Sequence, residues 1–331
     1  MKIIVEANIP YIKGLLEPFG SVEYLAPELI TADAVRSADA LFIRTRTRCN
    51  AALLDGSSVK FIATATIGTD HIDLDYCRDR GIHVSNAPGC NAPAVAQYVF
   101  ATIARLANLP KHPVLGVVGV GNVGSIIARW GERLGFRVLK CDPPRQRREG
   151  GDFTDIHTIA READIITFHT PLTREGSDAT YHLADAAFLD SLKRCRLLIN
   201  SARGPIVDNQ ALLKTIETTG LAAAIDCWEN EPNLLPGLLE KTFTATPHIA
   251  GYSAEGKMRA TTMALEAFEQ FYGVEIEGKP VVGAPAKGAD VTSLAQIAAS
   301  YDPFTDTAAL RANPAGFEAL RNHYNLRKEV V

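Results

Sequence analysis

The sequence lacks a long hydrophobic run, a closely spaced C-x-x-C cysteine pair and an excess of positive charge. No stretch approaches the roughly 18 apolar residues that a membrane-spanning helix requires. The N-terminal MKIIVEANIP reaches Glu6 and Asn8 before an apolar region of signal-peptide length develops. The six cysteines are scattered, which is typical of reduced cytosolic thiols. We therefore expect a cytoplasmic protein without a membrane anchor.

The charge balance excludes a second group of functions. The formal net charge is -4 and the sequence pI is about 6.1. Proteins that bind nucleic acid or anionic membranes by their overall field carry the opposite sign. We therefore expect a small-molecule or protein partner, no nucleic acid and no membrane, and we identify no metal site.

Short β-rich runs alternate with amphipathic stretches through most of the 331 residues. Several runs are almost entirely apolar, as expected of parallel strands that are buried on both faces. The predicted strands are Lys2–Glu6, Ala40–Ile43, Phe61–Thr66, Val114–Val118, Arg137–Cys141, Ile165–Phe168, Leu197–Asn200 and Ala222–Ile225. The sequence predicts an α/β protein with two domains built on parallel, doubly wound sheets.

Two segments mark the organisation of the chain. Asn91 and Pro93 open a helical pattern over Ala94–Ala107, which we predict to link two lobes. Gly273–Asp290 is rich in Gly, Pro and Lys and predicts a linker. The tail Thr292–Val331 is too short for a core of its own, so we expect it to pack on another surface, with a second subunit as the candidate.

A glycine motif, G-x-G-x-x-G at 119–124, follows the predicted strand Val114–Val118 and opens a predicted helix over Ser125–Leu134. This strand–turn–helix context makes the motif typical of a dinucleotide site. Gly119 and Gly121 permit a tight turn and close approach of a pyrophosphate, and Gly124 permits close helix–strand packing. The N–H groups of Asn122 and Val123 are predicted to face the phosphates.

An acidic residue lies where such a site needs one. Asp142 ends the predicted strand Arg137–Cys141, about 20 residues beyond the glycines, a position from which a carboxylate binds the adenosine ribose. Asp142 would repel a 2′-phosphate, so the sequence favours NAD over NADP. Arg145, Arg147 and Arg148 either offset this repulsion or form a solvated loop, and the sequence leaves both alternatives open.

Three residues near predicted strand ends fit the needs of hydride transfer from a hydroxy acid. Arg203 has the geometry to grip a carboxylate with two N–H bonds. His248 titrates in the range required to accept a hydroxyl proton. Glu231 is predicted to orient the imidazole, although the sequence alone does not separate Glu231 from Glu229 for this role.

The ordered motifs resemble those of the D-isomer-specific 2-hydroxyacid dehydrogenase family over about residues 1–272. They are G-V-G-N-V-G, C-D-P-P, F-H-T-P, N-S-A-R-G, D-C-W-E-N-E-P and T-P-H-I-A-G-Y. The resemblance implies a flavodoxin-like substrate domain (1–92, completed by 252–272), a Rossmann-type NAD-binding domain (93–251), and a linker and C-terminal dimerisation segment (273–331). It also implies a homodimer and an NAD-dependent oxidation.

Further contacts follow from the resemblance, position by position. It implies substrate contacts from Thr45, Thr66 and Tyr252 and cofactor contacts from Asp142, Thr170, Asp226 and Gly251. There are two departures: Thr45 stands where relatives carry Ser, which preserves a hydroxyl, and the C-terminal segment is shorter than theirs.

The run Arg44 to Arg48 points to a phosphate on the substrate. Arginines at alternate positions after the strand Ala40–Ile43 are predicted to project on one side, and we expect Arg44 or Arg46 to bind the phosphate. The resemblance implies oxidation at C2 of a phosphorylated four-carbon hydroxy acid, because the arginines alone do not fix the number of carbons. The alternatives are a dehydrogenase for phosphoglycerate, glycerate or hydroxypyruvate, or a dinucleotide-sensing corepressor-like protein.

Overall fold

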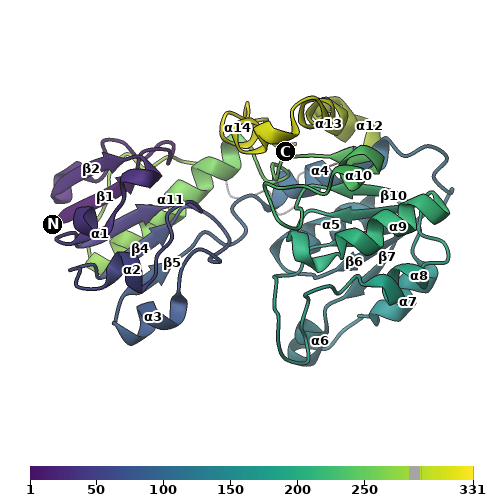
Figure 1. Cartoon of the computed structure of the whole chain (residues 1–331), viewed down its shortest axis with the longest axis horizontal. Helices are drawn as coiled ribbons and strands as arrows, with labels where there is room; N and C mark the ends of the chain where they lie inside the picture. The colour runs from purple at the N-terminus through teal and green to yellow at the C-terminus, as the bar shows by residue number, and fades with distance from the viewer. Residues whose placement is uncertain (283–290, 292, 331) are drawn as a thin grey trace. The chain divides into compact units, whose positions relative to one another are not determined.

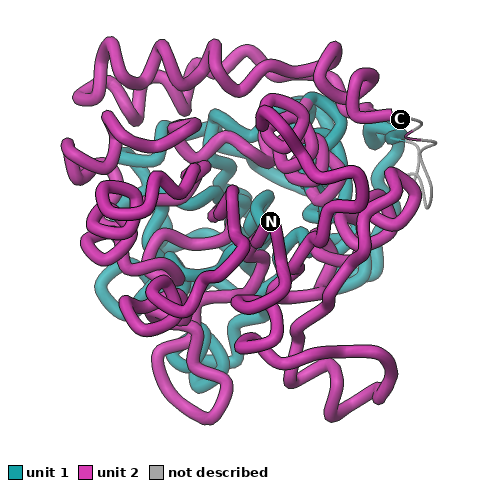
Figure 2. The backbone as a smooth tube through the Cα atoms, turned by 90° about the vertical axis from the view of Figure 1, so that its right-hand side faces the viewer, with its two compact units in different colours: residues 1–91, 254–286 teal, residues 92–253, 287–331 magenta. Residues whose placement is uncertain are grey.

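The computed structural model describes residues 1–282, 291 and 293–330 and divides into two compact units (Figure 2). Unit 1 comprises residues 1–91 and 254–286, and unit 2 comprises residues 92–253 and 287–331. Each unit is built on one parallel sheet, as the sequence predicts. Residues 283–290 of the predicted linker lie outside the described residues.

The sheet of unit 1 has five parallel strands in the order β2-β1-β3-β4-β5 (Figure 1), the flavodoxin-like order. Its strands are β1 (Lys2–Glu6), β2 (Ser21–Leu25), β3 (Ala40–Ile43), β4 (Phe61–Thr64) and β5 (His83–Ser85). The predicted strands β1 and β3 have the expected bounds, β4 ends two residues early, and β2 and β5 were not predicted.

Short helices connect these strands, and a long helix from much later in the chain completes the unit. They are η1 (Glu17–Phe19), η2 (Pro27–Leu29), α1 (Ala32–Val35), α2 (Ala51–Leu54), α3 (Leu74–Asp79) and α11 (Ala254–Tyr272). Phe268 of α11 packs against Phe42 and Phe61, with ring centroids 5.6 and 5.8 Å away. This aromatic cluster fixes α11 on the core of unit 1.

The sheet of unit 2 has six parallel strands in the order β11-β10-β9-β8-β6-β7. They are β6 (Val114–Val118), β7 (Arg137–Cys141), β8 (Ile165–Phe168), β9 (Leu197–Asn200), β10 (Ala222–Ile225) and β11 (Thr244–Ala245). The five predicted strands β6 to β10 are confirmed with their bounds, and β11 was missed. After β7 the chain crosses to the far side of β6, so the order reverses beside the glycine motif. This is the point where doubly wound sheets bind ligands.

Helices cover the sheet of unit 2. They are α4 (Ala92–Ala104), α5 (Asn122–Arg133), α6 (Pro143–Glu149), α7 (Ile156–Glu162), α8 (Ala186–Asp190), η3 (Gly204–Ile206), α9 (Asn209–Thr219) and α10 (Pro236–Lys241). The predicted linking helix is α4, and its residues 92–103 are all buried, so it belongs to the core. In the described part of the chain, no helix has the length and apolarity to cross a membrane.

The C-terminal segment packs on unit 2 of its own chain. It forms α12 (Leu294–Ser300), α13 (Pro303–Ala312), η4 (Pro314–Gly316) and α14 (Phe317–Asn322). Helix α12 packs on α4 (Figure 1), and α13 packs on β11. Leu310 and Phe317 join the core of the sheet. The expectation that the tail needs another surface is met within the chain, and its contact with a second subunit stays a prediction.

Candidate active site

The glycine motif lies between β6 and α5. Gly119 has a φ of 84°, in the left-handed region, and an added Cβ would lie 2.7 Å from the backbone of His169. A Cβ on Gly124 would lie 2.0 Å from the carbonyl oxygen of Gly119. At Gly121, no atom of the described chain lies within 4 Å of such a Cβ. Packing therefore requires the first and third glycines, while the second leaves space for a ligand.

The start of helix α5 offers backbone N–H groups beside this space. First-turn N–H groups have no acceptor within a helix, and the N-cap residue Gly121 has no side chain to accept from them. The N–H groups of Asn122 and Val123 are thus suited to bind phosphate, the role predicted for them.

Asp142, which follows β7, contacts the glycine loop. Its Oδ1 accepts a hydrogen bond from the N–H of Arg145 at 2.9 Å, and its Oδ2 accepts one from the N–H of Val120 at 2.8 Å. The carboxylate therefore caps α6 and ties the glycine loop to β7. A cavity of about 520 Å³ lies here, lined by Asp142 and by residues of the glycine loop, α5 and α6.

The arginines after Asp142 have carboxylate partners of their own. Arg145 and Arg148 lie 2.7 and 2.6 Å from the carboxylate of Glu149. Arg147 forms an ion pair with Asp178. Because each of these arginines already has a carboxylate partner, and the carboxylate of Asp142 would repel a phosphate, the arrangement favours a ribose without a phosphate, which is that of NAD.

Two buried hydroxyls support the presence of a cofactor. Thr170 follows β8 and Ser201 follows β9, the neighbouring strand. The Oγ1 of Thr170 and the Oγ of Ser201 are buried without a hydrogen-bond partner among the described residues. A buried hydroxyl without a partner is costly, so a bound ligand is expected to satisfy it. Thr170 was predicted, whereas Ser201 was missed although it lies within the N-S-A-R-G motif.

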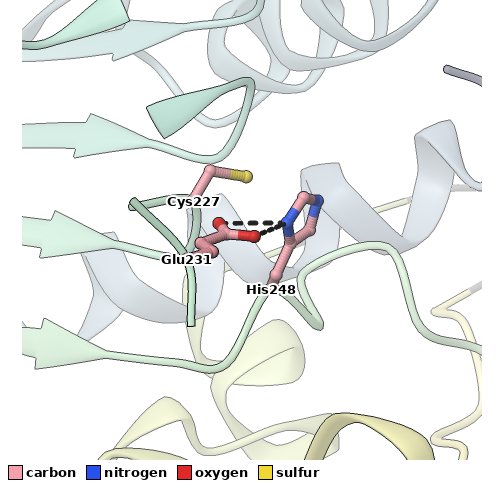
Figure 3. Close-up of side chains that lie close together, drawn as sticks. All are labelled: Cys227, Glu231 and His248. Carbon is pink, nitrogen blue, oxygen red and sulfur yellow. Dashed lines mark hydrogen bonds and ion pairs between the residues drawn. The ribbon is translucent and has the colours of Figure 1, made fainter. Parts of the chain in front are cut away.

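His248 and Glu231 form a partly buried pair (Figure 3). The Nδ1 of His248 lies 2.8 Å from Oε2 and 3.1 Å from Oε1 of Glu231, and Oε1 also accepts from the N–H of Trp228. Burial raises the pKa of Glu231, but the charge of His248 and these hydrogen bonds outweigh it, so its pKa lies below the ordinary value. An ionised Glu231 accepts the Nδ1–H and leaves Nε2, on the far side of the ring, to take a proton.

Asp226 orders the loop that carries His248. Its carboxylate accepts hydrogen bonds from the hydroxyl of Thr246 at 2.7 Å and from the N–H groups of Ile249 and Ala250 at 2.8 and 3.1 Å. Its backbone oxygen accepts from the N–H of His248 at 3.0 Å. Burial raises the pKa of Asp226 above its ordinary value, although the charge of His248 and these hydrogen bonds lower it. The cofactor contact that the resemblance implies for Asp226 stays a prediction.

Both catalytic loops hold a residue in the left-handed backbone region. The φ of His248 is 56° and that of Asn230, next to Glu231, is 59°. Such a conformation costs on the order of 1–3 kcal/mol outside glycine and persists only where the surroundings enforce it. The hydrogen bonds of Asp226 and Trp228 provide that enforcement.

Arg203 lies on a loop that contacts the Glu231 loop directly. The Nδ2 of Asn200 donates to the carbonyl oxygen of Arg203 at 2.9 Å and to that of Cys227 at 3.4 Å. A Cβ on Gly204 would lie 1.9 Å from the carbonyl oxygen of Trp228, so only glycine fits between the loops. The structure thus brings the three predicted catalytic residues onto adjoining loops of unit 2, while their roles stay predictions.

Cys227 lies beside the pair, and its Sγ is within 4.8 Å of the ligand-type atoms of Glu231 and His248. The thiol donates to the carbonyl oxygen of Ala202 at 3.4 Å. Burial, followed by the charges of Asp226 and Glu231, raises the pKa of Cys227 well above its ordinary value. Metal ligation needs a thiolate and a free imidazole nitrogen. The trio therefore fits a proton-handling pair next to a neutral thiol better than a metal site.

Glu231 is the glutamate that contacts His248, whereas Glu229 contacts a second histidine, His182. The Oε1 of Glu229 lies 2.7 Å from the Nε2 of His182, and its Oε2 accepts from the N–H of Asn209 at 2.9 Å. The N–H of His182 in turn donates to the carbonyl oxygen of Pro205 at 2.7 Å. His182 and Glu229 thus form a clamp that joins the Arg203 loop to the Glu231 loop, and sequence reasoning missed His182.

Gly251 and Tyr252 close the His248 loop. The N–H of Tyr252 donates to the carbonyl oxygen of Ile249 at 2.8 Å. The Oη of Tyr252 accepts a hydrogen bond from the Nε of Arg321, a residue of α14, at 3.2 Å. No sequence motif pointed to Arg321. Contacts of Gly251 with cofactor and of Tyr252 with substrate stay predictions.

The arginine run of unit 1 differs from its predicted geometry. The N–H of Thr47 donates to the carbonyl oxygen of Arg44 at 3.3 Å, so the chain turns after β3 through Thr45 and Arg46. The expectation that alternate arginines share one side of an extended segment is therefore wrong. Arg44 donates through Nη1 to the carbonyl oxygen of Asn8, and its Nε is buried without a partner among the described residues.

Thr66 lies beyond the end of β4 within a small polar network. Its Oγ1 lies 2.6 Å from the Oγ1 of Thr64 and 3.2 Å from the carbonyl oxygen of Gly68. The Nε2 of His71 lies 3.3 Å from the Oγ1 of Thr64, and burial lowers the pKa of His71 to about 4. This network fixes Thr66 on unit 1, and its contact with a substrate stays a prediction.

These features define a class of protein. A glycine loop at the switch point of a parallel sheet, and a partly buried Glu–His pair with an arginine on the adjoining loop, are those of a nicotinamide-dependent dehydrogenase. Residues 100–250 match the family model described as D-isomer specific 2-hydroxyacid dehydrogenase, NAD binding domain. The chain belongs to the D-isomer-specific 2-hydroxyacid dehydrogenase family.

Similar proteins support this assignment over nearly the whole chain. A protein named erythronate-4-phosphate dehydrogenase from Bacteroides fragilis is 46% identical and covers 99% of this chain and 97% of its own length. One of the same name from Klebsiella pneumoniae is 43% identical, covering 99% and 92%. D-lactate dehydrogenase from Aquifex aeolicus, solved with NAD and lactic acid, has a TM-score of 0.70 at 25% identity, covering 82% of this chain and 96% of that one.

Substitution can separate the roles of the second and third glycines of the motif. Gly124→Ala should destabilise the protein by about 1–3 kcal/mol, because its Cβ meets the backbone of Gly119. Gly121→Ala should change stability by less than about 0.5 kcal/mol but weaken NADH binding, because its Cβ enters open space. Thermal denaturation and NADH fluorescence titration measure these effects. Equal destabilisation by both substitutions would contradict this division.

The clamp predicts unequal roles for two nearby glutamates. Glu231→Gln should lower kcat by on the order of 10² or more, because the ionised partner of His248 is lost. Glu229→Gln keeps the side-chain volume and should lower kcat about 3- to 10-fold, because it only loosens the loop. Steady-state kinetics at saturating NAD compares them, with the NADH dissociation constant as control. A Glu229→Gln effect as large as that of Glu231→Gln would overturn the assignment.

His169 predicts an acid-sensitive element near the glycine loop. Burial lowers its pKa to about 3, and its Nε2 lies 2.7 Å from the Oγ1 of Thr167. The unfolded chain binds this proton at about pH 6.5 and the folded chain only at much lower pH, so stability is lost as pH falls between these values. In a ¹⁵N NMR titration, the ring of His169 should therefore remain neutral at pH 5. A protonated His169 ring at that pH would refute this.

Proposed function

We propose that this protein oxidises 4-phospho-D-erythronate at C2 with NAD, giving (R)-3-hydroxy-2-oxo-4-phosphooxybutanoate on the route to pyridoxal 5′-phosphate. The observation that carries the proposal is the Glu231–His248 pair beside Arg203, in a chain that aligns over 99% of its length with proteins named for this substrate. The motifs A-T-A-T-I-G-T-D-H-I-D at 63–73 and A-P-G-C-N-A at 87–92 add to this similarity.

The proposed chemistry assigns one task to each residue. NAD, when bound, accepts the hydride that leaves C2. The Nε2 of His248 accepts the proton of the C2 hydroxyl, so that the alcohol becomes a ketone and one proton stays on the protein. Glu231 stabilises the imidazolium that forms, because it already accepts the Nδ1–H at 2.8 Å. Arg203 holds the substrate carboxylate with its planar guanidinium.

Further substrate contacts are proposed for the residues that the resemblance and the arginine run indicate. In unit 1, Arg44 or Arg46 is proposed to bind the phosphate, supported by the buried Nε of Arg44 that has no partner among the described residues. Thr45 and Thr66 in unit 1 and Tyr252 in unit 2 are proposed to contact the substrate through their hydroxyls. The proposal includes a cytoplasmic homodimer, for which the resemblance of the tail is the support.

The proposal is preferred to two alternatives. A dehydrogenase for phosphoglycerate, glycerate or hydroxypyruvate would share the catalytic residues but differ in the carbon chain that it accepts. A dinucleotide-sensing corepressor-like protein would not need a base supported by a carboxylate. The retained Arg203, Glu231 and His248 favour an enzyme, and the relatives' names favour the four-carbon substrate.

The test is an NADH absorbance assay with 4-phospho-D-erythronate, 3-phosphoglycerate and D-glycerate. We expect the highest kcat/KM with 4-phospho-D-erythronate, and a higher value for either three-carbon acid would reject the substrate assignment. His248→Ala should lower kcat by on the order of 10² to 10⁴, the usual effect of losing a general base. His323→Ala, an exposed histidine of the same chain, is the matched control.

A further inference from the structure

The residues that follow α14 pack against the segment that carries His248. Ser253, which lies just beyond the His248 loop, forms an isolated parallel β-bridge with Arg327. The Nε2 of Gln97, on α4, donates to the carbonyl oxygen of Lys328 at 3.1 Å. The end of the chain therefore contacts both α4 and the segment after His248.

Arg327 makes the closest of these contacts through its side chain. The residue is only 8% exposed. Its Nη1 donates to the carbonyl oxygen of Ile249 at 3.1 Å, and its Nη2 donates to the carbonyl oxygen of Ala250. The same Nη2 donates to the carbonyl oxygen of Ala94, in the first turn of α4, at 3.1 Å. One guanidinium therefore joins α4 to the two residues that directly follow His248.

The tail holds this guanidinium from the other residues of its own segment. The Cζ of Arg327 lies 4.4 Å from the ring centroid of Tyr301, and its Nη1 donates to the Oη of Tyr324 at 3.4 Å. Both tyrosine hydroxyls donate to the Oδ2 of Asp306, at 2.8 and 3.2 Å. Burial raises the pKa of Asp306 above its ordinary value, although these hydroxyls and the charge of Arg327 lower it. Arg327 is thus positioned by groups that are not part of the His248 loop.

The carboxylate of Asp226 binds the same two residues through their N–H groups. It accepts from Ile249 at 2.8 Å and from Ala250 at 3.1 Å, while Arg327 binds their carbonyl oxygens. The peptide group between Ile249 and Ala250 therefore has its N–H on a carboxylate and its C=O on a guanidinium, in the direction of its own dipole. Turning this peptide over would direct its C=O at the carboxylate and its N–H at the cation. The two side chains thus permit one orientation of the chain after His248.

His248 needs this support because its backbone conformation is unfavourable. Its φ of 56° lies in the left-handed region, which residues other than glycine seldom occupy. Its Nδ1 nevertheless lies 2.8 Å from Glu231. A relaxed backbone would turn the ring away from Glu231, and a general base must lie within hydrogen-bond reach of the proton that it accepts. The place of Nε2 therefore depends on the contacts that hold the next two residues.

We propose that Arg327 is a positioning residue for the base: its guanidinium holds the His248 loop in the conformation that places the imidazole for proton transfer. The inference rests on the proposed function for the role of His248. It gives the C-terminal segment a part in catalysis within its own chain, apart from any contact with a second subunit. Arg327 acts through the backbone of the loop and is assigned no contact with substrate or cofactor.

The test compares Arg327→Gln and Arg327→Lys with Arg311→Gln. Arg311 lies in the same tail, on α13, and also donates to two carbonyl oxygens, those of Leu239 and Thr242. It is therefore a matched arginine that holds a different segment. Arg327→Lys keeps the charge but replaces the planar fork with a single ammonium group. The melting temperature of each variant is measured, and kinetics are recorded well below the lowest of them.

We expect Arg327→Gln to lower kcat by about 10- to 100-fold and to leave the NADH dissociation constant within about threefold, because it displaces the base and not the glycine loop. Arg327→Lys should retain more of the activity than Arg327→Gln. Arg311→Gln should keep kcat within about twofold, even where its melting temperature falls as far. A normal kcat in Arg327→Gln would mean that the residue only stabilises the fold, and it would overturn the proposal.

A double substitution tests whether Arg327 acts through His248. If it does, adding Arg327→Gln to His248→Ala should lower the residual kcat by less than about threefold, because the ring that it positions is already absent. Losses of similar size in both backgrounds would mean that Arg327 affects another part of the reaction, and they would contradict a positioning role.

Hydrogen exchange tests the anchoring of the loop without any substrate. Mass spectrometry follows the N–H groups of Ile249 and Ala250 in Arg327→Gln, with Arg311→Gln as the control. We expect exchange about tenfold faster or more in Arg327→Gln alone, because local opening of the loop becomes easier. Unchanged exchange in Arg327→Gln would reject the inference.

The exchange measurement also separates this inference from the proposed function. If 4-phospho-D-erythronate is not oxidised but exchange depends on Arg327, the substrate assignment fails and the anchoring of the loop stands. The kinetic comparisons are then made with the 2-hydroxy acid that the protein does oxidise, and they decide the positioning role by the same outcomes.

Discussion

The buried carboxylate of Asp226 is the interaction on which the catalytic geometry depends. It accepts the N–H groups of Ile249 and Ala250, while the guanidinium of Arg327 binds the carbonyl oxygens of the same two residues. The two peptide units after His248 are therefore held between a fixed anion and a fixed cation from distant parts of the chain. Charge-assisted hydrogen bonds of this kind are stronger than neutral ones. They can hold the left-handed backbone of His248 in place.

Contacts of this kind also link the His248 loop to the Glu231 loop and the Glu231 loop to the Arg203 loop. Trp228 and Glu231 lie on the loop that Asp226 begins, and Gly204 lets the Arg203 loop approach the backbone of Trp228. The clamp of His182 and Glu229 also joins the Arg203 loop to the Glu231 loop. His248, Glu231 and Arg203 are thus positioned by contacts between the loops that follow three neighbouring strands, so a small shift in one loop is transmitted to the others.

Sequence reasoning predicted the parts of the structure that local sequence patterns encode. The largely apolar runs of β6, β8, β9 and β10 have the burial expected of parallel strands covered on both faces, and their bounds were predictable for that reason. Strand β7 is a partly exposed edge strand, and its bounds were predicted as well. Strand β2 is half exposed at a sheet edge and β11 has two residues, so neither forms a strong pattern. The turn after β3 was missed because Arg44 to Arg48 contains neither Gly nor Pro. His182 and Arg321 were missed because a single His or Arg has no motif, and only the tertiary structure brings them to the site.

The charge balance of the proposed reaction explains why charged side chains in fixed positions suit it. In the proposed oxidation a hydride neutralises the positive ring of the nicotinamide while a proton gives His248 a positive charge, so the net charge of the enclosed region does not change. Fixed groups such as Arg203 and Glu231 therefore need not move or change protonation between substrate and product. The lowered pKa of Glu231 keeps it ionised throughout, beside the point where the positive charge of His248 develops. Charged groups that are already in place need no reorganisation when the reaction occurs. The hydrogen bonds of Asp226 and Arg327 hold the His248 loop in such a fixed arrangement.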